Sequence, residues 1–196
     1  MARKPRKDEV WKALAAESGG TLVHDRRGRV RGVRFKADAW VVVLDSYTQS
    51  SGKTSQNYTR VRSVFRARDD LRFRIYRSTI FSQLGKRFGM QDLEVGVPGV
   101  DEAYIVQSNS VGKVQSLLLL RDVAGPLVVL RAGKLEIRPF RQKGINKAEW
   151  MELVYEVSGV IRDANRLRIM VSMLEATIRH LGKNGTASRD AAPFEI

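Results

Sequence analysis

The amino-acid sequence predicts a single α+β domain, in which a mostly antiparallel sheet is packed by a long C-terminal helix and several short helices. Apolar residues recur at spacings of three and four over residues 146–181, as they do on one helix face. Apolar and polar residues alternate over residues 58–77, as they do in half-buried strands. The 196 residues are 43% hydrophobic and 29% charged, which is enough apolar content for a real core. We place the domain at residues 8–182, after a flexible basic arm (1–7) and before a disordered tail (183–196).

The N-terminal part is predicted to hold one helix and then mainly strands. Residues 8–18 carry an apolar stripe at helical spacing, and residues 21–24 and 30–35 flank a turn. Residues 40–44 (Trp-Val-Val-Val-Leu) form a β-branched run without alternation, which is typical of a strand covered on both faces. The polar residues 46–57 are expected to form a mobile loop.

A long hairpin is predicted next, with strands at residues 58–67 and 71–77 joined by a turn at 68–70. The alternation places apolar side chains on one face, suited to packing against a helix, and arginines on the other. Arginine pairs bidentately with oxyanions, so a row of arginines on a rigid sheet could hold an anion. The candidate anion-binding residues are Arg60, Arg62, Arg66, Arg68, Arg72 and Arg74.

The second half of the chain alternates between helical and extended patterns. Short helices are expected at residues 79–88 and 110–120, and a strand at 104–106. Residues 127–130 and 135–137 flank a glycine-containing turn and are expected to form a second hairpin.

The pattern over residues 146–181 predicts one long helix. Asn146 and Glu149 fit a capping box at its start, and Gly182 fits a C-terminal cap. Its apolar face could cover the sheet, pair with a second copy of the chain as in a coiled coil, or do both. Apolar flanking residues broaden that face and favour the sheet. For a homodimer, the interface residues would include Leu153, Val157, Val160, Leu167, Val171 and Leu174.

The charge balance points to an anionic partner. The chain has 35 basic and 21 acidic residues, giving a formal charge of +14. Such an excess fits nucleic acid, an anionic membrane surface or an acidic protein, although an arginine-biased composition alone could also produce it. The chain has no cysteine and no apolar run of the ~18 residues that a membrane span requires. No apolar segment follows the basic N-terminus, so we expect a cytoplasmic, non-transmembrane protein.

No catalytic or metal-binding motif is present. Residues 51–54 (Ser-Gly-Lys-Thr) lack the upstream glycine and the following helix of a phosphate-binding loop. The two histidines, His24 and His180, have no partners at metal-ligand spacing. We therefore predict no metal and no cofactor. An enzyme would require the fold to bring Asp45, Asp101 or His24 together in a cleft.

Residues 100–109 (Val-Asp-Glu-Ala-Tyr-Ile-Val-Gln-Ser-Asn), followed by the helix up to Leu120, resemble a stretch in a group of uncharacterised bacterial proteins. Those proteins carry a Phe-Asp-x-x-Phe-x-Val-x-Ser pattern before a leucine-bearing helix and a short hairpin. Asp101, Val106 and Ser108 match, whereas Val100 and Tyr104 stand where the pattern has phenylalanine. The resemblance implies a bacterial α+β domain and carries over no site residue.

Taken together, these patterns predict a non-enzymatic binding module that engages an anionic partner through its arginine face. The alternative is a scaffold domain that self-associates through the long helix, and the third possibility is an enzyme of unknown class.

Overall fold

The computed structural model describes residues 6–77, 91–141, 149–190 and 192. Its strands are β1 (Thr21–His24), β2 (Val30–Ala37), β3 (Trp40–Ser51), β4 (Thr54–Arg66), β5 (Phe73–Arg77), β6 (Gln91–Leu93), β7 (Tyr104–Ser108), β8 (Lys134–Pro139) and β9 (Trp150–Ser158). Its helices are α1 (Lys7–Glu17), α2 (Pro98–Asp101), α3 (Val111–Leu118), α4 (Arg121–Leu130) and α5 (Ala164–Lys183).

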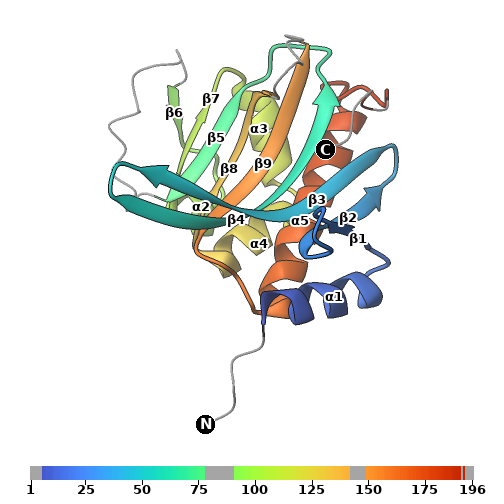
Figure 1. Cartoon of the computed structure of the whole chain (residues 1–196). Helices are drawn as coiled ribbons and strands as arrows, with labels where there is room; N and C mark the ends of the chain where they lie inside the picture. Colours follow the sequence, from blue (N-terminus) through green and yellow to red (C-terminus); the bar gives the residue numbers. More distant parts are fainter. Residues whose placement is uncertain (1–5, 78–90, 142–148, 191, 193–196) are drawn as a thin grey trace.

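All of these strands belong to one sheet, in the order β1-β2-β3-β4-β9-β8-β5-β7-β6 (Figure 1). Every neighbouring pair is antiparallel. The predicted α+β class, with a mostly antiparallel sheet and a C-terminal helix, is therefore confirmed.

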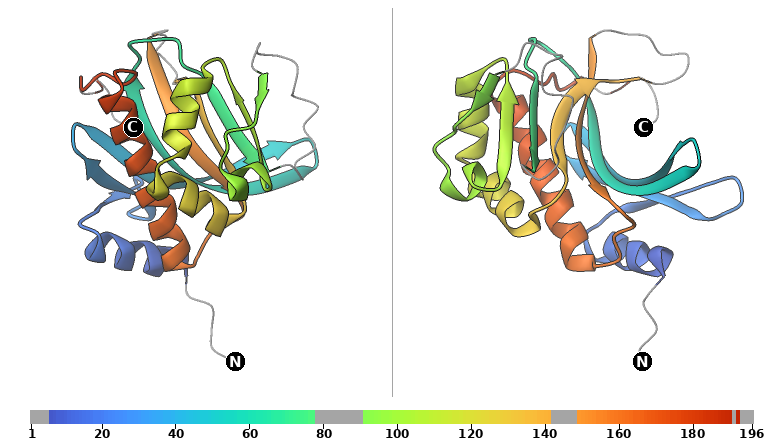
Figure 2. Two further views of the ribbon diagram at one scale, coloured as in Figure 1. Left: turned by 180° about the vertical axis from the view of Figure 1, so that it is seen from behind. Right: turned by 90° about the vertical axis from the view of Figure 1, so that its left-hand side faces the viewer.

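The helices pack on one side of the curved sheet, and the other side carries no helix in the described part of the chain (Figure 2). Alternate residues of the central strands, including Leu44, Phe65 and Leu153, point into the helical layer and are fully buried there. Leu174 and Ile178 of α5 meet them in the same core. The sheet thus has a helix-covered face that forms the core and an open face that is available for contacts.

The single long helix predicted at residues 146–181 is wrong. Residues 150–158 form β9, which lies between β4 and β8, and only residues 164–183 are helical. A spacing of four, such as Leu153 to Val157, fits the two-residue period of a strand as well as a helix face. Gly159 has a φ of 92°, which ends the strand, and the Asp163 carboxylate accepts the Arg166 N–H at 2.9 Å to cap α5.

This correction removes the dimer interface that the sequence pattern predicted. Its residues no longer share one helix face, because some lie on β9, one lies in the connection that follows, and the others lie on α5. The buried members belong to the core of a single chain, so they could reach a partner only if that core opened. Leu153, Val157, Leu167, Val171 and Leu174 are buried, and Val160 is half-buried.

The predicted pairing of residues 58–67 with 71–77 is also wrong. β4 pairs with β3 and β9, whereas β5 pairs with β7 and β8. The expected mobile loop at residues 46–57 is instead the outer half of the β3–β4 hairpin, which turns at Gly52, where φ is 57°. In the sheet, residues 48–51 pair with residues 54–57, beyond the part of β4 that pairs with β9, and side chains on both faces of this segment are polar, so no alternation marks it as strand.

Some of the other local predictions are confirmed, and one is wrong. The structure confirms the helices near residues 8–18 and 110–120 and the strand at 104–106. Residues 127–130 lie in α4 rather than in a hairpin, because Val123, Leu127 and Leu130 are buried at helical spacing despite Pro126. The helix expected at residues 79–88 lies outside the described residues.

The C-terminal segment packs against the domain, and the disordered tail expected from residue 183 is wrong for residues 183–190. The main chain of Ser188 donates to the Arg66 carbonyl at 2.9 Å. The Trp40 indole N–H donates to the Ser188 carbonyl at 2.9 Å, and Ala187 is buried. These residues close the edge of the core beside β3 and β4.

Candidate functional site

The open face of the sheet carries the candidate site. Direct cross-strand partners share a face of an antiparallel sheet. Asp45 of β3 is opposite Arg60 of β4, which is opposite Glu156 of β9. Lys134 of β8 is opposite Glu156. Charged residues of opposite sign therefore lie side by side across the strands.

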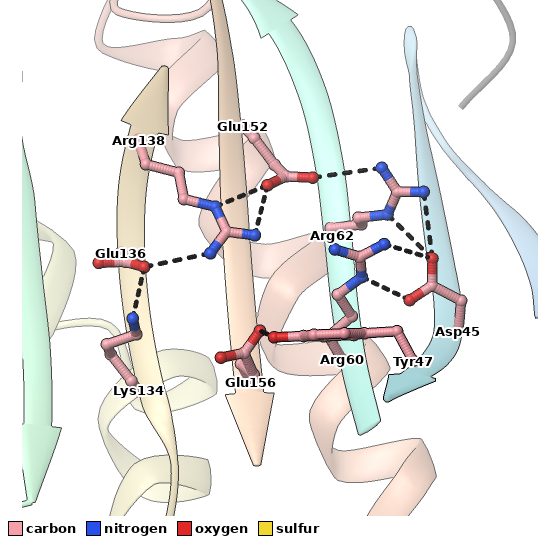
Figure 3. A network of polar contacts seen from close by, with 9 residues as sticks. All are labelled: Asp45, Tyr47, Arg60, Arg62, Lys134, Glu136, Arg138, Glu152 and Glu156. Atoms are coloured by element: carbon pink, nitrogen blue, oxygen red, sulfur yellow. Dashed lines mark hydrogen bonds and ion pairs between the residues drawn. The ribbon is translucent and has the colours of Figure 1, made fainter. Parts of the chain in front are cut away.

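One half of this arrangement joins β3, β4 and β9 (Figure 3). Arg60 Nε donates to Asp45 Oδ1 at 2.6 Å, and Arg62 Nε donates to Asp45 Oδ2 at 3.1 Å. Arg62 also reaches across to Glu152, with 3.2 Å from Nη1 to Oε1. The other oxygen of Glu152 accepts Arg138 Nε at 2.7 Å. Asp45 and Glu152 thus each bridge two guanidinium groups.

The other half centres on Glu136 of β8. Its carboxylate lies 2.9 Å from Arg74 Nε and 2.7 Å from Lys134 Nζ. Arg138 Nη1 donates at 3.4 Å to Glu136 Oε1, the oxygen that Lys134 also contacts. Burial acts to raise the pKa of Glu136, but Lys134 and Arg74 outweigh it and leave the pKa below its ordinary value. Glu136 is therefore ionised at neutral pH.

Tyr47 closes the network on the β3 side. Its hydroxyl donates to Glu156 Oε2 at 2.6 Å. Its ring stacks on Tyr58 with centroids 5.2 Å apart, and the Arg60 guanidinium lies 4.8 Å from the ring centroid. Burial and the Glu156 carboxylate raise the pKa of Tyr47, so the hydroxyl stays a donor. These contacts fix the base of the β3–β4 hairpin to the sheet.

The network is close to electrically neutral. It joins five basic side chains (Arg60, Arg62, Arg74, Lys134, Arg138) to four acidic ones (Asp45, Glu136, Glu152, Glu156). A strand-by-strand count of arginines overlooked the acids, because those acids come from β3, β8 and β9. Recognising residues 150–158 as a strand would have revealed Glu152 and Glu156 on one face.

The structure separates the six candidate arginines. Arg60, Arg62 and Arg74 lie in the network. Arg66 pairs with Glu149 and Asp190 at 3.5 Å each, at the end of β4. Arg68 contacts the Ser188 hydroxyl at 3.4 Å, and Arg72 donates to the Leu71 carbonyl at 2.8 Å. They do not form one continuous cationic row.

A cleft opens where β5 and β8 separate. Their pairing ends at Arg74 and Glu136, whereas β8 continues beside β9 as far as Pro139. The resulting β5–β8 cleft has a volume of about 160 Å³. Its lining combines apolar and cationic groups with one carboxylate: Arg72, Phe73, Arg74, Glu136, Ile137, Arg138 and Pro139.

The three residues that an enzyme would need to gather do not meet. Asp45 belongs to the network on β3, and His24 is exposed at the end of β1. Asp101 accepts the main-chain N–H groups of Val95 and Val97 at 3.0 Å each. Five strand spacings separate β3 from β7, beside Asp101, or roughly 24 Å at ~4.8 Å each. In the part of the chain that the structure describes, no three potential metal ligands are grouped.

No family model matches this chain, and no curated protein matches its sequence. Among solved structures, the crystal structure of the mycobacterial trehalose monomycolate transport factor A, TtfA, is similar with a TM-score of 0.49. The two sequences are 10% identical, and the match covers 89% of this chain and 94% of that chain. Within the described residues, no helix combines the length and apolarity needed to cross a membrane.

Proposed function

We propose that this chain is a non-enzymatic binding module that holds a carboxylate-bearing ligand in the β5–β8 cleft. The observation that carries the proposal is the charge of the lining. The lining holds Arg72, Arg74 and Arg138 and one carboxylate, Glu136. Glu152, outside the lining, pairs with Arg138 and Glu136 pairs with Arg74, so Arg72 is the lining cation without a counter-charge among the described residues. An anion bound there would restore the local balance that the rest of the open face already has.

Within the cleft lining, Arg72 is the cation with the most binding capacity left. Among the described residues its guanidinium group makes one hydrogen bond, from Nη1 to the Leu71 carbonyl, which uses one of its five donors. None of the described carboxylates lies within 4.0 Å of it. Arg138, by contrast, is held by Glu152 and Glu136 and supplies a fixed positive field.

The lining favours a carboxylate on an apolar stem over a polyanion. Phe73, Ile137 and Pro139 supply apolar walls, and a volume of about 160 Å³ admits only a small group. A nucleic-acid backbone running across the open face would meet four carboxylates as well as the arginines. The mixed charges on that face are therefore better suited to one acidic side chain or small acid than to a row of phosphates.

The experiment titrates the protein with benzoate and with benzamide, its uncharged isostere, while main-chain amide NMR signals are followed. We expect benzoate to shift the signals of Phe73 and Ile137 and benzamide to leave them in place. Arg72→Gln should weaken benzoate binding about tenfold, as loss of one charge-assisted pair predicts. Arg121→Gln, at the exposed start of α4, serves as the matched control.

Equal responses to benzoate and benzamide, or unchanged affinity in Arg72→Gln, would overturn the proposal. A parallel titration with heparin tests the polyanion alternative. Salt-sensitive heparin binding that Arg72→Gln leaves unchanged would favour nucleic acid or another polyanion at a different surface.

A further inference from the structure

Three arginines from distant parts of the chain gather at one end of the helix-covered face. Arg77 ends β5 and is the cross-strand partner of Tyr104, where β7 begins. β8 begins at the same edge, since Lys134 pairs with Tyr76, and Arg131 lies in the turn just before it.

β9 ends at this edge too, because Glu156 pairs with Lys134, and the connection from β9 leads to Arg166 in the first turn of α5. Burial raises the pKa of the Tyr104 hydroxyl, while Arg77, Arg166 and Arg131 each act on it in the opposite direction. All three guanidinium groups therefore act on the same buried hydroxyl.

The turn that carries Arg131 is held rigidly. The Tyr104 hydroxyl donates to the Leu127 carbonyl at 2.9 Å and accepts the Ala132 N–H at 3.1 Å. The Tyr155 hydroxyl donates to the Ala132 carbonyl at 2.5 Å. Arg131 itself adopts a φ of 40°, a left-handed conformation that glycine or asparagine normally takes after a helix. The fold thus holds an arginine where its backbone is strained.

These arginines lack the counter-charges that the open face provides. No ion pair within 4.0 Å joins Arg77, Arg131 or Arg166 to any described carboxylate. The side-chain carboxylate of Asp163, nearby on the same element, is used to cap α5. The sequence outside the described residues contains one acidic residue, Glu195, so it has little negative charge to offer.

In two of the three, a buried N–H donor has no partner among the described residues. The Nε atoms of Arg77 and Arg166 are inaccessible to solvent and have no hydrogen-bond partner in the described part of the chain. A buried, unpaired donor on a charged group is costly, and like charges brought together add to that cost. Arg131 is exposed and the other two are half-buried, so the cluster still opens to solvent.

We propose that Arg77, Arg131 and Arg166 form a binding site for a phosphate group, with the phosphate supplying the missing counter-charge. A phosphate near neutral pH carries up to two negative charges and several acceptor oxygens, which matches three guanidinium groups at one edge of the sheet better than a carboxylate does. The site lies on the other face of the sheet from the β5–β8 cleft and does not rest on the function proposed for it.

The test uses inorganic phosphate as the probe and thermal unfolding as the readout, against chloride at equal pH and ionic strength. We expect phosphate to raise the unfolding temperature of the wild type in a saturable way. Arg166→Gln should weaken the phosphate response about tenfold. Arg168→Gln is the matched control, because Arg168 lies on the same helix but pairs with Glu17 and Asn165.

Arg131→Gly separates a binding role from a structural one. Glycine relieves the left-handed strain, so the variant should be at least as stable as the wild type in chloride while its response to phosphate falls. The proposal is overturned if phosphate stabilises the wild type no more than chloride does. It is equally overturned if Arg131→Gly and Arg166→Gln keep the wild-type response.

Discussion

Replacement of Glu152 by alanine tests whether the open-face network stabilises the fold. The Glu152 side chain is 7% exposed and bridges Arg62, 14% exposed, and Arg138, 32% exposed. Removing one partner of a fully buried pair costs ~3–5 kcal/mol, whereas an exposed pair contributes ~0–1 kcal/mol. Because two guanidinium groups would lose their counter-charge in a partly solvated setting, we expect a loss of about 2–3 kcal/mol.

The assay is equilibrium unfolding in urea, which leaves ion pairs unscreened. With an m-value of ~2 kcal/mol/M, the midpoint should fall by about 1–1.5 M at unchanged m. Glu149→Ala is the matched control: its pair with Arg66 spans 3.5 Å, and both side chains are about half exposed. That variant should lose less than ~0.5 kcal/mol. If the two variants shift the midpoint equally, the network contributes no more than an ordinary surface pair and the reasoning fails.

Three further outcomes follow from the C-terminal part of the chain. Gly182→Ala should destabilise the protein by ~1–3 kcal/mol in urea unfolding, despite alanine's better helix propensity, because a Cβ there would clash with the Trp40 indole; equal or higher stability would contradict this packing. Deletion of residues 185–196 should lower the free energy of unfolding by about 2–4 kcal/mol, because it removes buried side chains and the acceptor of the Trp40 indole N–H. An unchanged unfolding temperature would refute this prediction. Burial and Lys183 lower the pKa of His180 in the folded protein, so the unfolded chain takes up a proton more readily as the pH falls. The free energy of unfolding in urea should therefore fall as the pH is lowered from about 7.5 to about 5.5. His180→Gln should flatten that slope, and an unaltered slope would assign it to other groups.

Local patterns were enough to predict the α+β class and several element positions. Neighbouring residues mark the boundaries of α1 and β1: an apolar stripe at helical spacing, then a glycine pair, then a short extended segment before a turn. Such local patterns do not show which strands pair with each other. β4 lies beside β9, about 90 residues later in the chain, and nothing local to residues 58–67 indicates it.

The error at residues 146–181 has a definite physical origin. Leu153 and Val157 are separated by an even number of residues, so they lie on one side of a strand as well as of a helix. The β-branched and aromatic side chains of residues 150–158 and the glycine at 159 distinguish the two cases, and they favour a strand. The same error hid Glu152 and Glu156, and with them the charge balance of the open face.

Arginine content alone therefore says little about where an anion would bind in this fold. Arg60 and Arg62 alternate correctly on an open sheet face, yet Asp45 and Glu152 occupy their donors and hold them in place. Arg77 and Arg166 form no pattern in the sequence, because about 90 residues separate them, but the fold buries their Nε atoms without a partner among the residues that the structure describes. A guanidinium group gains most from an external anion where the protein has left its charge and donors unmatched. By that criterion the cationic excess of the chain matters at the edge of the helix-covered face and at Arg72, rather than along the row of arginines that the alternation displays.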